Sequence, residues 1–272
     1  MRATLIVIGI LLFAIALRSA KRAWIRKLGA VGFLVASYAA CFFLIGTWWG
    51  GCIGIFLWLF LPWVELFTRI RNMRLPMDNR LHHATLPNPA FFPNAVACLQ
   101  ALEESGFDHN SDCGWHWSGM KQYCRLFLNP SQKTVASLCL CEHADVVFSF
   151  ISITSITTEG SILRTTNYPF APTLKFPQKY RWNHVPCTRH CFRQILASHE
   201  QFVHQLGVAE NHLQSIDPDL LEDMIEAEMH EMIEHNLDHG IIEFAGDGCF
   251  SYSTKGLIYL WGQFLKDMVR LC

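Results

Sequence analysis

The longest feature of the hydrophobic pattern is an apolar block of about 40 residues, residues 28–67, in which Glu65 is the only ionisable carboxylate. Basic residues flank the block on both sides: Arg18, Lys21, Arg22, Arg26 and Lys27 precede it, and Arg69, Arg71 and Arg74 follow it. A long apolar block between positive flanks is typical of a membrane anchor, because positive residues in short loops stay on the cytoplasmic side.

The length of the block predicts a helical hairpin. One helix of this length would measure about 60 Å at a rise of about 1.5 Å per residue, twice the hydrocarbon core of about 30 Å. Gly50 and Gly51 allow a tight reversal, and the preceding Trp48 and Trp49 favour a membrane–water interface. We therefore predict transmembrane helices over residues 28–47 and 52–67, with a kink near Pro62.

A shorter apolar run at residues 3–17 is predicted as a further transmembrane helix. The charge rule then places the N-terminus outside, residues 18–27 inside and the turn at 47–51 outside. Residues 68–272 are predicted to lie in the cytoplasm, on a plasma (inner) membrane of bacterial type. The alternative for residues 3–17 is a signal peptide, because Ala14-Ile15-Ala16 has the small-x-small form of a cleavage site.

The pattern changes after a Pro-rich linker at residues 75–92. Helical spacing of Val96, Leu99 and Leu102 predicts a helix over residues 93–105. A polar loop is predicted next, at 108–120. Alternating or β-branched runs then predict four strands: 123–128, 134–141, 146–156 and 161–166. The short connections between these strands favour an antiparallel meander, so residues 93–168 are predicted to be an α+β domain.

A second Pro-rich stretch, residues 169–187, is predicted to be a connector. Residues 188–272 are predicted to be a helical region with a β-hairpin. The helices are expected at 188–206, 215–239 and 256–271, and the hairpin is expected around Gly246-Asp247-Gly248. The predicted fold class is thus an α+β soluble domain on an N-terminal α-helical membrane anchor, residues 1–74.

The C-terminal run resembles the wing of winged-helix domains over about 40 residues. A helix leads through Gly240 and Ile241 into a hairpin, and Ser253-Thr254-Lys255-Gly256 begins the next helix. The resemblance implies that the helix at 215–239 takes the recognition position of the DNA-binding members. That helix carries no Lys or Arg and these carboxylates: Glu222, Asp223, Glu226, Glu228, Glu231 and Glu234. Phosphates would be repelled, so the resemblance implies a role in protein interaction.

Composition adds a strong charge asymmetry. Residues 1–74 carry nine Lys or Arg and one acid, whereas residues 75–272 carry 13 Lys or Arg and 22 acids. An acidic domain lacks the cations that neutralise nucleic-acid phosphates, so no nucleic-acid partner is expected. The basic part suits anionic lipid headgroups of a bilayer. Nine of the 11 cysteines lie in the acidic part without regular spacing, which indicates reduced thiols in a reducing compartment.

Acids and histidines concentrate between Arg193 and Lys255, where no other Lys or Arg occurs. Two rows at helical spacing are candidate ligands of a divalent metal: Glu226, His230 and Glu234, and Glu231, His235 and His239. The HExxH pattern of metalloproteases is absent, because Glu234 stands where the second histidine would be. The alternative is a solvated acidic helix face with pH-sensitive histidines.

Two further groups of residues are candidate chemical sites. Cysteine and histidine ligands suit zinc, but these residues lack CxxC spacing: Cys139, Cys141, His143, His184, Cys187, His190 and Cys191. Cys113 and His116 could form a thiol–imidazole pair, with a structural loop as the alternative. No nucleophile elbow, phosphate loop or dinucleotide glycine pattern occurs in the chain.

The sequence therefore supports two functional hypotheses. The first is a non-enzymatic membrane protein whose acidic cytoplasmic domain binds another protein or a small ligand near the membrane, with no cofactor. The second is a metal-dependent enzyme, a hydrolase, that uses His and Glu residues of 199–239 and a divalent metal.

Overall fold

The structure is a computed structural model that describes residues 2–20, 22–117, 119–143, 146–186 and 191–270. The chain divides into two compact units. We call the first the helical unit; it comprises Met1–Met73, Phe170–Thr173 and Ser251–Cys272. The second, the sheet unit, comprises Arg74–Pro169 and Leu174–Phe250. A mixed fold of helices and a β-sheet, with apolar N-terminal helices, is confirmed.

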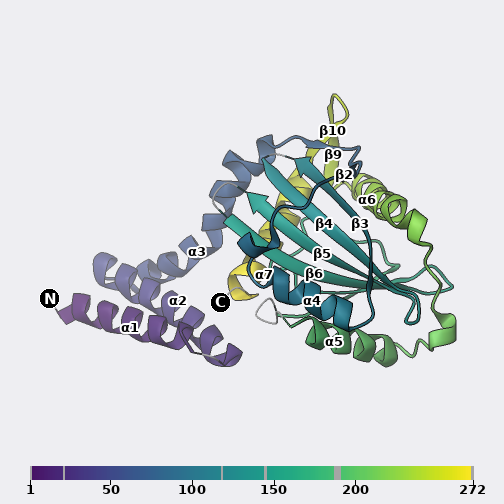
Figure 1. The fold of residues 1–272 in the computed structure, drawn as a ribbon. Helices are drawn as coiled ribbons and strands as arrows, with labels where there is room; N and C mark the ends of the chain where they lie inside the picture. The colour runs from purple at the N-terminus through teal and green to yellow at the C-terminus, as the bar shows by residue number, and fades with distance from the viewer. Residues whose placement is uncertain (1, 21, 118, 144–145, 187–190, 271–272) are drawn as a thin grey trace. The chain divides into compact units, whose positions relative to one another are not determined.

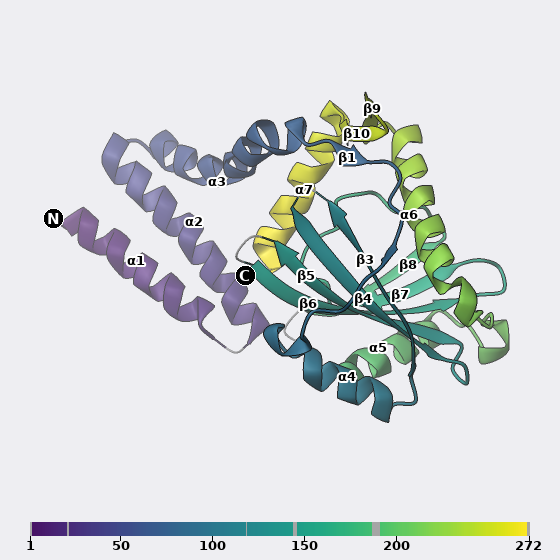
Figure 2. The ribbon, with the colours of Figure 1, turned by 45° about the horizontal axis from the view of Figure 1, so that its top comes forward.

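The helical unit contains α1 (Arg2–Arg18), α2 (Ala23–Ile45), α3 (Trp48–Thr68) and α7 (Thr254–Arg270), and α1 and α2 run side by side in Figure 2. The chain reverses between α2 and α3 at Gly46 and Thr47, earlier than predicted. Gly46 adopts a left-handed conformation with φ of 75°, and the Thr47 hydroxyl caps α3 by accepting from the Gly50 amide. Gly50 and Gly51 therefore lie inside α3, because one αL glycine and one cap are enough for the turn.

Small residues let α2 and α3 pack closely. A Cβ added at Gly54 would collide with the backbone carbonyl of Ser37. The Trp58 indole donates to the Ser37 hydroxyl at 2.7 Å, so polar and steric contacts coincide. Two helical stretches of this unit, Trp24–Ile45 and Trp48–Asn72, are long and apolar enough to cross a membrane.

The sheet unit is built on a seven-stranded sheet of order β2-β3-β4-β5-β6-β7-β8 (Figure 1). Its strands are β2 (His82–His83), β3 (Asp108–Trp117), β4 (Met120–Asn129), β5 (Thr134–His143), β6 (Val146–Ile156), β7 (Ile162–Thr166) and β8 (Tyr180–His184). The strands from β2 to β7 pair antiparallel, which confirms the meander, and β8 joins β7 in parallel.

Four strands contradict the sequence prediction: two of only two residues, Leu75–Pro76 and His82–His83, lie in the predicted linker, and two longer ones lie further along the chain. Residues 108–120 were expected to be a loop, but Asp108–Trp117 forms β3, paired with β2 and β4. The polar composition of this strand lacks the alternating apolar pattern that predicts a strand. Gly114 is required within it, because a Cβ there would meet the Gln122 carbonyl. The Pro-rich connector contains β8, which pairs in parallel with β7. Parallel pairing of two separated segments leaves no local signal in the sequence.

Helices cover both faces of this sheet. One face packs on α4 (Ala95–Glu104) and α5 (Phe192–Gln205), through a core that includes Leu102, Phe127, Leu138 and Phe192. Figure 1 shows α4 and α5 beside each other on this side. The other face carries a second cluster with Cys124, Cys139 and Leu221. Leu221 begins α6 (Leu221–Asp238), so the acidic helix lies on this second face.

A small sheet of order β1-β10-β9 completes the structure, with β1 (Leu75–Pro76), β9 (Ile242–Gly246) and β10 (Cys249–Tyr252). The predicted helix–hairpin–helix order of the C-terminal region is thus present as α6, β9, β10 and α7. Short 3-10 turns occur at Ile70–Asn72, Pro89–Phe91, Glu210–His212 and Pro218–Leu220. The winged-helix resemblance itself stays a prediction.

Candidate functional site on the acidic helix

The two ends of the acidic helix α6 are set by its local sequence. Its entry is the turn Pro218–Leu220, where the Asp217 carboxylate accepts from the Asp219 amide at 3.1 Å. Glu222 and Asp223 in the first turn oppose the positive end of the helix dipole. After His239, Gly240 has a φ of 64°, which stops the helix.

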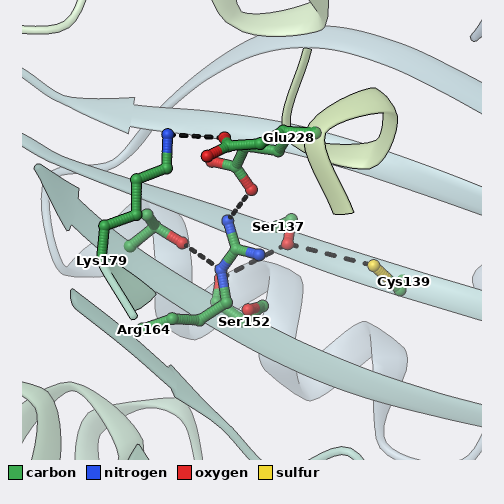
Figure 3. Close-up of polar contacts among 8 residues, drawn as sticks. Ser137, Cys139, Ser152, Arg164, Lys179 and Glu228 are labelled. Carbon is green, nitrogen blue, oxygen red and sulfur yellow. Dashed lines mark hydrogen bonds and ion pairs between the residues drawn. The ribbon is translucent and has the colours of Figure 1, made fainter. Parts of the chain in front are cut away.

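The inner face of α6 carries a nearly buried ion pair with the sheet. Arg164 Nη2 lies 2.6 Å from Glu228 Oε2, and the two side chains are only 17% and 9% exposed. Arg164 Nε also donates to Thr154 Oγ1 at 2.9 Å, and its guanidinium lies 5.6 Å from the centre of the Trp182 ring. Figure 3 shows Arg164 reaching from the sheet to Glu228. The pair therefore fixes the helix on this face of the sheet.

The register of the sheet explains why Arg164 lies next to Thr154 and Trp182. Thr154, Arg164 and Trp182 are directly paired across β6, β7 and β8, so the three side chains form one row on one face. Lys179, just before β8, makes a second contact, with Glu231 at 2.5 Å. Burial, followed by the nearby carboxylate of Glu228, raises the pKa of Tyr180. The Tyr180 hydroxyl is thus a neutral neighbour of the pair at physiological pH.

The outer face of α6 borders an open groove of about 400 Å³. Its lining residues are Met77, Asp78, Asn79, Arg80, Asp223, Glu226, Ala227, Met229 and His230. One wall is the segment 77–80, which follows β1, and the other is the helix. Three carboxylates and one guanidinium face this groove, so its charge is negative.

Two contacts set the shape of the groove. The Leu81 amide donates to Glu226 Oε1 at 2.6 Å, which ties the segment 77–80 to α6. Arg80 Nε lies 3.1 Å from Asp78 Oδ2, so the guanidinium is held against the carboxylate of its own wall. Asp223 and Glu226 therefore provide the negative charge of the opposite wall, next to the flexible thioether of Met229.

The two predicted metal-binding rows take different environments. In the first, Glu226 binds the Leu81 amide, while His230 Nε2 lies 3.2 Å from Glu234 Oε1 in an exposed pair. In the second, Glu231 pairs with Lys179, and the rings of His235 and His239 lie 4.0 Å apart. Over the described ranges, no group of three His, Cys, Asp or Glu side chains is arranged to hold a metal ion. A divalent metal here stays a prediction.

The predicted cysteine–histidine groups are not brought together. Cys139 and Cys141 lie on β5, whereas His184 lies on β8, three strands away in the sheet. Three strand spacings amount to about 14 Å, too far for one metal ion. Cys187 and His190 lie outside the described residues.

The predicted thiol–imidazole pair is also separated. Cys113 is fully buried and packs with Cys124 on the α6 side of the sheet. The exposed His116, at an odd spacing along β3, contacts Tyr123 of the opposite core. Burial raises the pKa of Cys113 to about 12, so this thiol stays protonated and cannot act as a nucleophile.

A buried polar network lies on the opposite face of the sheet, under α5. His199 Nε2 lies 3.1 Å from Ser155 Oγ, and His199 Nδ1 lies 2.9 Å from Thr165 Oγ1. His199 is 2% exposed, and burial lowers its pKa to about 4. The imidazole is therefore neutral and enclosed, which suits a structural role for a residue that the sequence grouped with metal ligands.

Sequence reasoning missed four residues of this site: Asp78, Arg80, Arg164 and Glu228. The two wall residues belong to a segment predicted to be only a linker, and Arg164 lies in a predicted strand without any sign of its partner. Glu228 did have a signal, because it falls on the apolar stripe of the helix with Leu221 and Ile225. A carboxylate on that stripe predicts a buried partner.

Comparison with known proteins finds no family model, no curated protein and no solved structure that matches the chain.

Proposed function

We propose that this chain is a membrane-anchored, non-enzymatic binding protein whose acidic domain recognises a basic segment of another protein. The observation that carries the proposal is the groove on the outer face of α6, with carboxylates on both walls and methionines at its surface. The α+β unit supplies the recognition surface, and the apolar helices keep it next to a bilayer.

Exposure of the apolar helices supports the membrane part of the proposal. In the stretches Trp24–Ile45 and Trp48–Asn72, only 11% and 22% of the most apolar window is buried inside the structure. A core helix of a soluble protein would bury most of its apolar surface. The basic residues on both flanks support an orientation in which residues 68–272 lie on the cytoplasmic side of a plasma (inner) membrane.

The groove suits an extended, basic occupant better than a small molecule. Small-molecule sites enclose most of the ligand surface, whereas this groove is open along one helix face. Its carboxylates favour Lys or Arg side chains, and Met77 and Met229 adapt to apolar side chains between them. Opposite charge also raises the rate of encounter with a basic partner.

A peptide titration tests the proposal on the full-length chain in lipid nanodiscs. The probes are a short Lys/Leu peptide and its Glu/Leu counterpart, measured by calorimetry at low and physiological salt. The Lys/Leu peptide should bind and the Glu/Leu peptide should not. The double variant Asp223→Asn/Glu226→Gln should weaken binding about tenfold, because each lost exposed ion pair contributes about 0.2–1 kcal/mol.

The matched control is Asp238→Asn, which removes one exposed carboxylate from the same helix outside the groove. It should leave the affinity within about twofold of wild type, since charge at that distance is largely screened. The groove variant removes two charges and the control removes one, so a control that loses half as much binding free energy as the groove variant would mean that net charge, not the groove, attracts the peptide. Equal binding of both peptides would contradict the proposal.

The metal-dependent hydrolase remains a second proposal. The groove places Asp78 opposite Asp223, Glu226 and His230, which are donor types for a divalent cation. Elemental analysis of the purified full-length chain tests it, and a stoichiometric metal lost in a Glu226→Gln variant would favour it.

A further inference from the structure

The C-terminal helix α7 is attached to α3 within the helical unit. Trp261 Nε1 donates to the backbone carbonyl of Leu59 at 2.8 Å. The Trp261 ring also stacks on Trp63, with ring centres 5.9 Å apart and an angle of 27° between the rings. One side chain of α7 thus makes both a polar and an aromatic contact with the C-terminal half of α3.

Trp261 contacts α3 in the turn that precedes Pro62. Pro62 lies inside α3 and has no N–H, so the carbonyl four residues earlier, that of Trp58, loses its usual helical donor. The Leu59 carbonyl, which accepts from Trp261, is the next one along the helix. The contact between α7 and α3 therefore lies beside the turn that the proline interrupts.

One side of α7 faces protein. Leu257 and Leu260 are 2% and 1% exposed, and Asp267 on the same side is 9% exposed. The Asp267 carboxylate accepts from the Ala171 amide at 2.7 Å, and the Tyr259 hydroxyl donates to the Pro172 carbonyl at 3.4 Å. The segment 170–173, which lies in the same unit, therefore covers part of this side of the helix.

The other side of α7 carries apolar residues next to exposed basic ones. Ile258 is 55% exposed, and the half-buried Leu265, two turns further on, shares its face. Lys255 and Lys266 are exposed next to this strip. An apolar strip bordered by lysines is the pattern of helices that lie in a membrane interface, with the strip among the acyl chains and the ammonium groups among the headgroups.

The contacts with α3 also indicate how deep α7 would lie in the membrane. Trp63 is the last tryptophan of α3, and tryptophans favour the interface. Leu59 lies one turn earlier, which is about 6 Å further along the helix. Interfacial helices are buried by about 5–10 Å, so the depth of Trp261 agrees with that of such a helix.

We propose that α7 is an interfacial helix of the membrane anchor, with the Ile258–Leu265 strip inserted in an anionic bilayer. The inference rests on the proposed membrane anchoring of α3 and adds a second lipid-binding element, more than 180 residues away in the sequence. The chain would therefore contact the bilayer at both ends, with the sheet unit between them in the sequence.

Photo-crosslinking of the full-length chain in vesicles of phosphatidylcholine and phosphatidylglycerol tests the inference. Benzoylphenylalanine is introduced singly at Ile258, at the exposed Leu57 of α3, and at the exposed Gln201 of α5. Lipid adducts are counted by mass spectrometry. The yield at Ile258 should approach that at Leu57 and exceed that at Gln201 about tenfold. Replacement of phosphatidylglycerol by phosphatidylcholine should reduce the yield at Ile258 more than at Leu57, because of the neighbouring lysines.

The outcomes separate the two proposals. Adducts at Leu57 with only the Gln201 background at Ile258 would overturn the interfacial helix and leave the anchor intact. Background yields at both Leu57 and Ile258 would overturn the anchor itself, and the interfacial helix with it. Each variant is purified by size exclusion first, so that a misfolded sample is recognised by its elution.

Discussion

Glutamates on the inner and outer faces of α6 have different roles. Glu228, on the inner face, is 9% exposed and paired with Arg164 of the sheet. On the outer face, Glu234 is 62% exposed and pairs with an equally exposed histidine, His230. The two glutamates are six positions apart, but burial makes the inner pair a structural element and leaves the outer pair in contact with solvent.

The difference follows from solvation. Water already stabilises an exposed carboxylate, so an exposed partner adds about 0–1 kcal/mol. A carboxylate that has lost its water depends on its partner, and removing that partner costs about 3–5 kcal/mol. Acidic composition alone therefore says little about the role of any one glutamate in this helix.

The largest expected effect comes from breaking the inner pair. Arg164→Met and Glu228→Met should each destabilise the sheet unit by about 3–5 kcal/mol, because each leaves one nearly buried charge without its partner. The double variant should be closer to wild type than the sum of the two single variants. Urea unfolding of the detergent-solubilised chain, followed by circular dichroism, measures these differences. Strict additivity would contradict the pairing.

A smaller effect concerns the buried imidazole on the opposite face of the sheet. Burial lowers the pKa of His199 to about 4, whereas an unfolded histidine titrates near 6.5. As the pH falls from about 6.5 to 4, the unfolded chain therefore gains the proton first, and about 3 kcal/mol of the free energy of unfolding should be lost. Above pH 6.5 both states are neutral and this contribution vanishes.

The variant His199→Gln serves as the control for this pH dependence. It removes the titrating group, so the difference between wild type and variant should change across the interval from pH 6.5 to 4 and stay constant above it. Urea midpoints collected at several pH values measure this difference. A constant difference over the whole range would show that His199 is already protonated or exposed in the folded chain.

The smallest expected effect lies on the outer face. Glu234→Gln should change the free energy of unfolding by no more than about 0.5 kcal/mol, because the pair with His230 is exposed and at i,i+4 spacing. The same urea experiment measures it beside Glu228→Met. A loss comparable to that of the inner pair would mean that the outer face is also buried in the native state, and the contrast between the faces would fail.

Much of the sheet could be predicted from local patterns. The strand Val146–Ile156 has the bounds that its β-branched and aromatic run predicted, and α4 begins and ends within two residues of its expected limits. The strands β3 and β8 were missed because their stability comes from neighbours, β2 and β4 for one and β7 for the other. Strand propensity is weak when partners decide the outcome.

Only part of the candidate site could be predicted from the sequence. Helical spacing placed Glu226, His230 and Glu234 along one side of α6, where His230 and Glu234 are exposed and Glu226 is half-buried. It could not show that Asp78 and Arg80 would form the opposite wall of a groove, because that depends on a hydrogen bond between Leu81 and Glu226, 145 residues apart. It also could not distinguish Glu228 from its neighbours without the position of Arg164.

Local patterns were enough to predict the apolar helices, the antiparallel meander and the end of the acidic helix at Gly240, because periodicity and turn residues act over a few positions. The start of that helix was expected at residue 215, but α6 begins at Leu221, after the turn Pro218–Leu220. The burial of Glu228, the second wall of the groove and the contact of Trp261 with α3 depend on the tertiary structure. Those features require residues distant in the chain to meet, and burial, not residue type, then sets what each charge does.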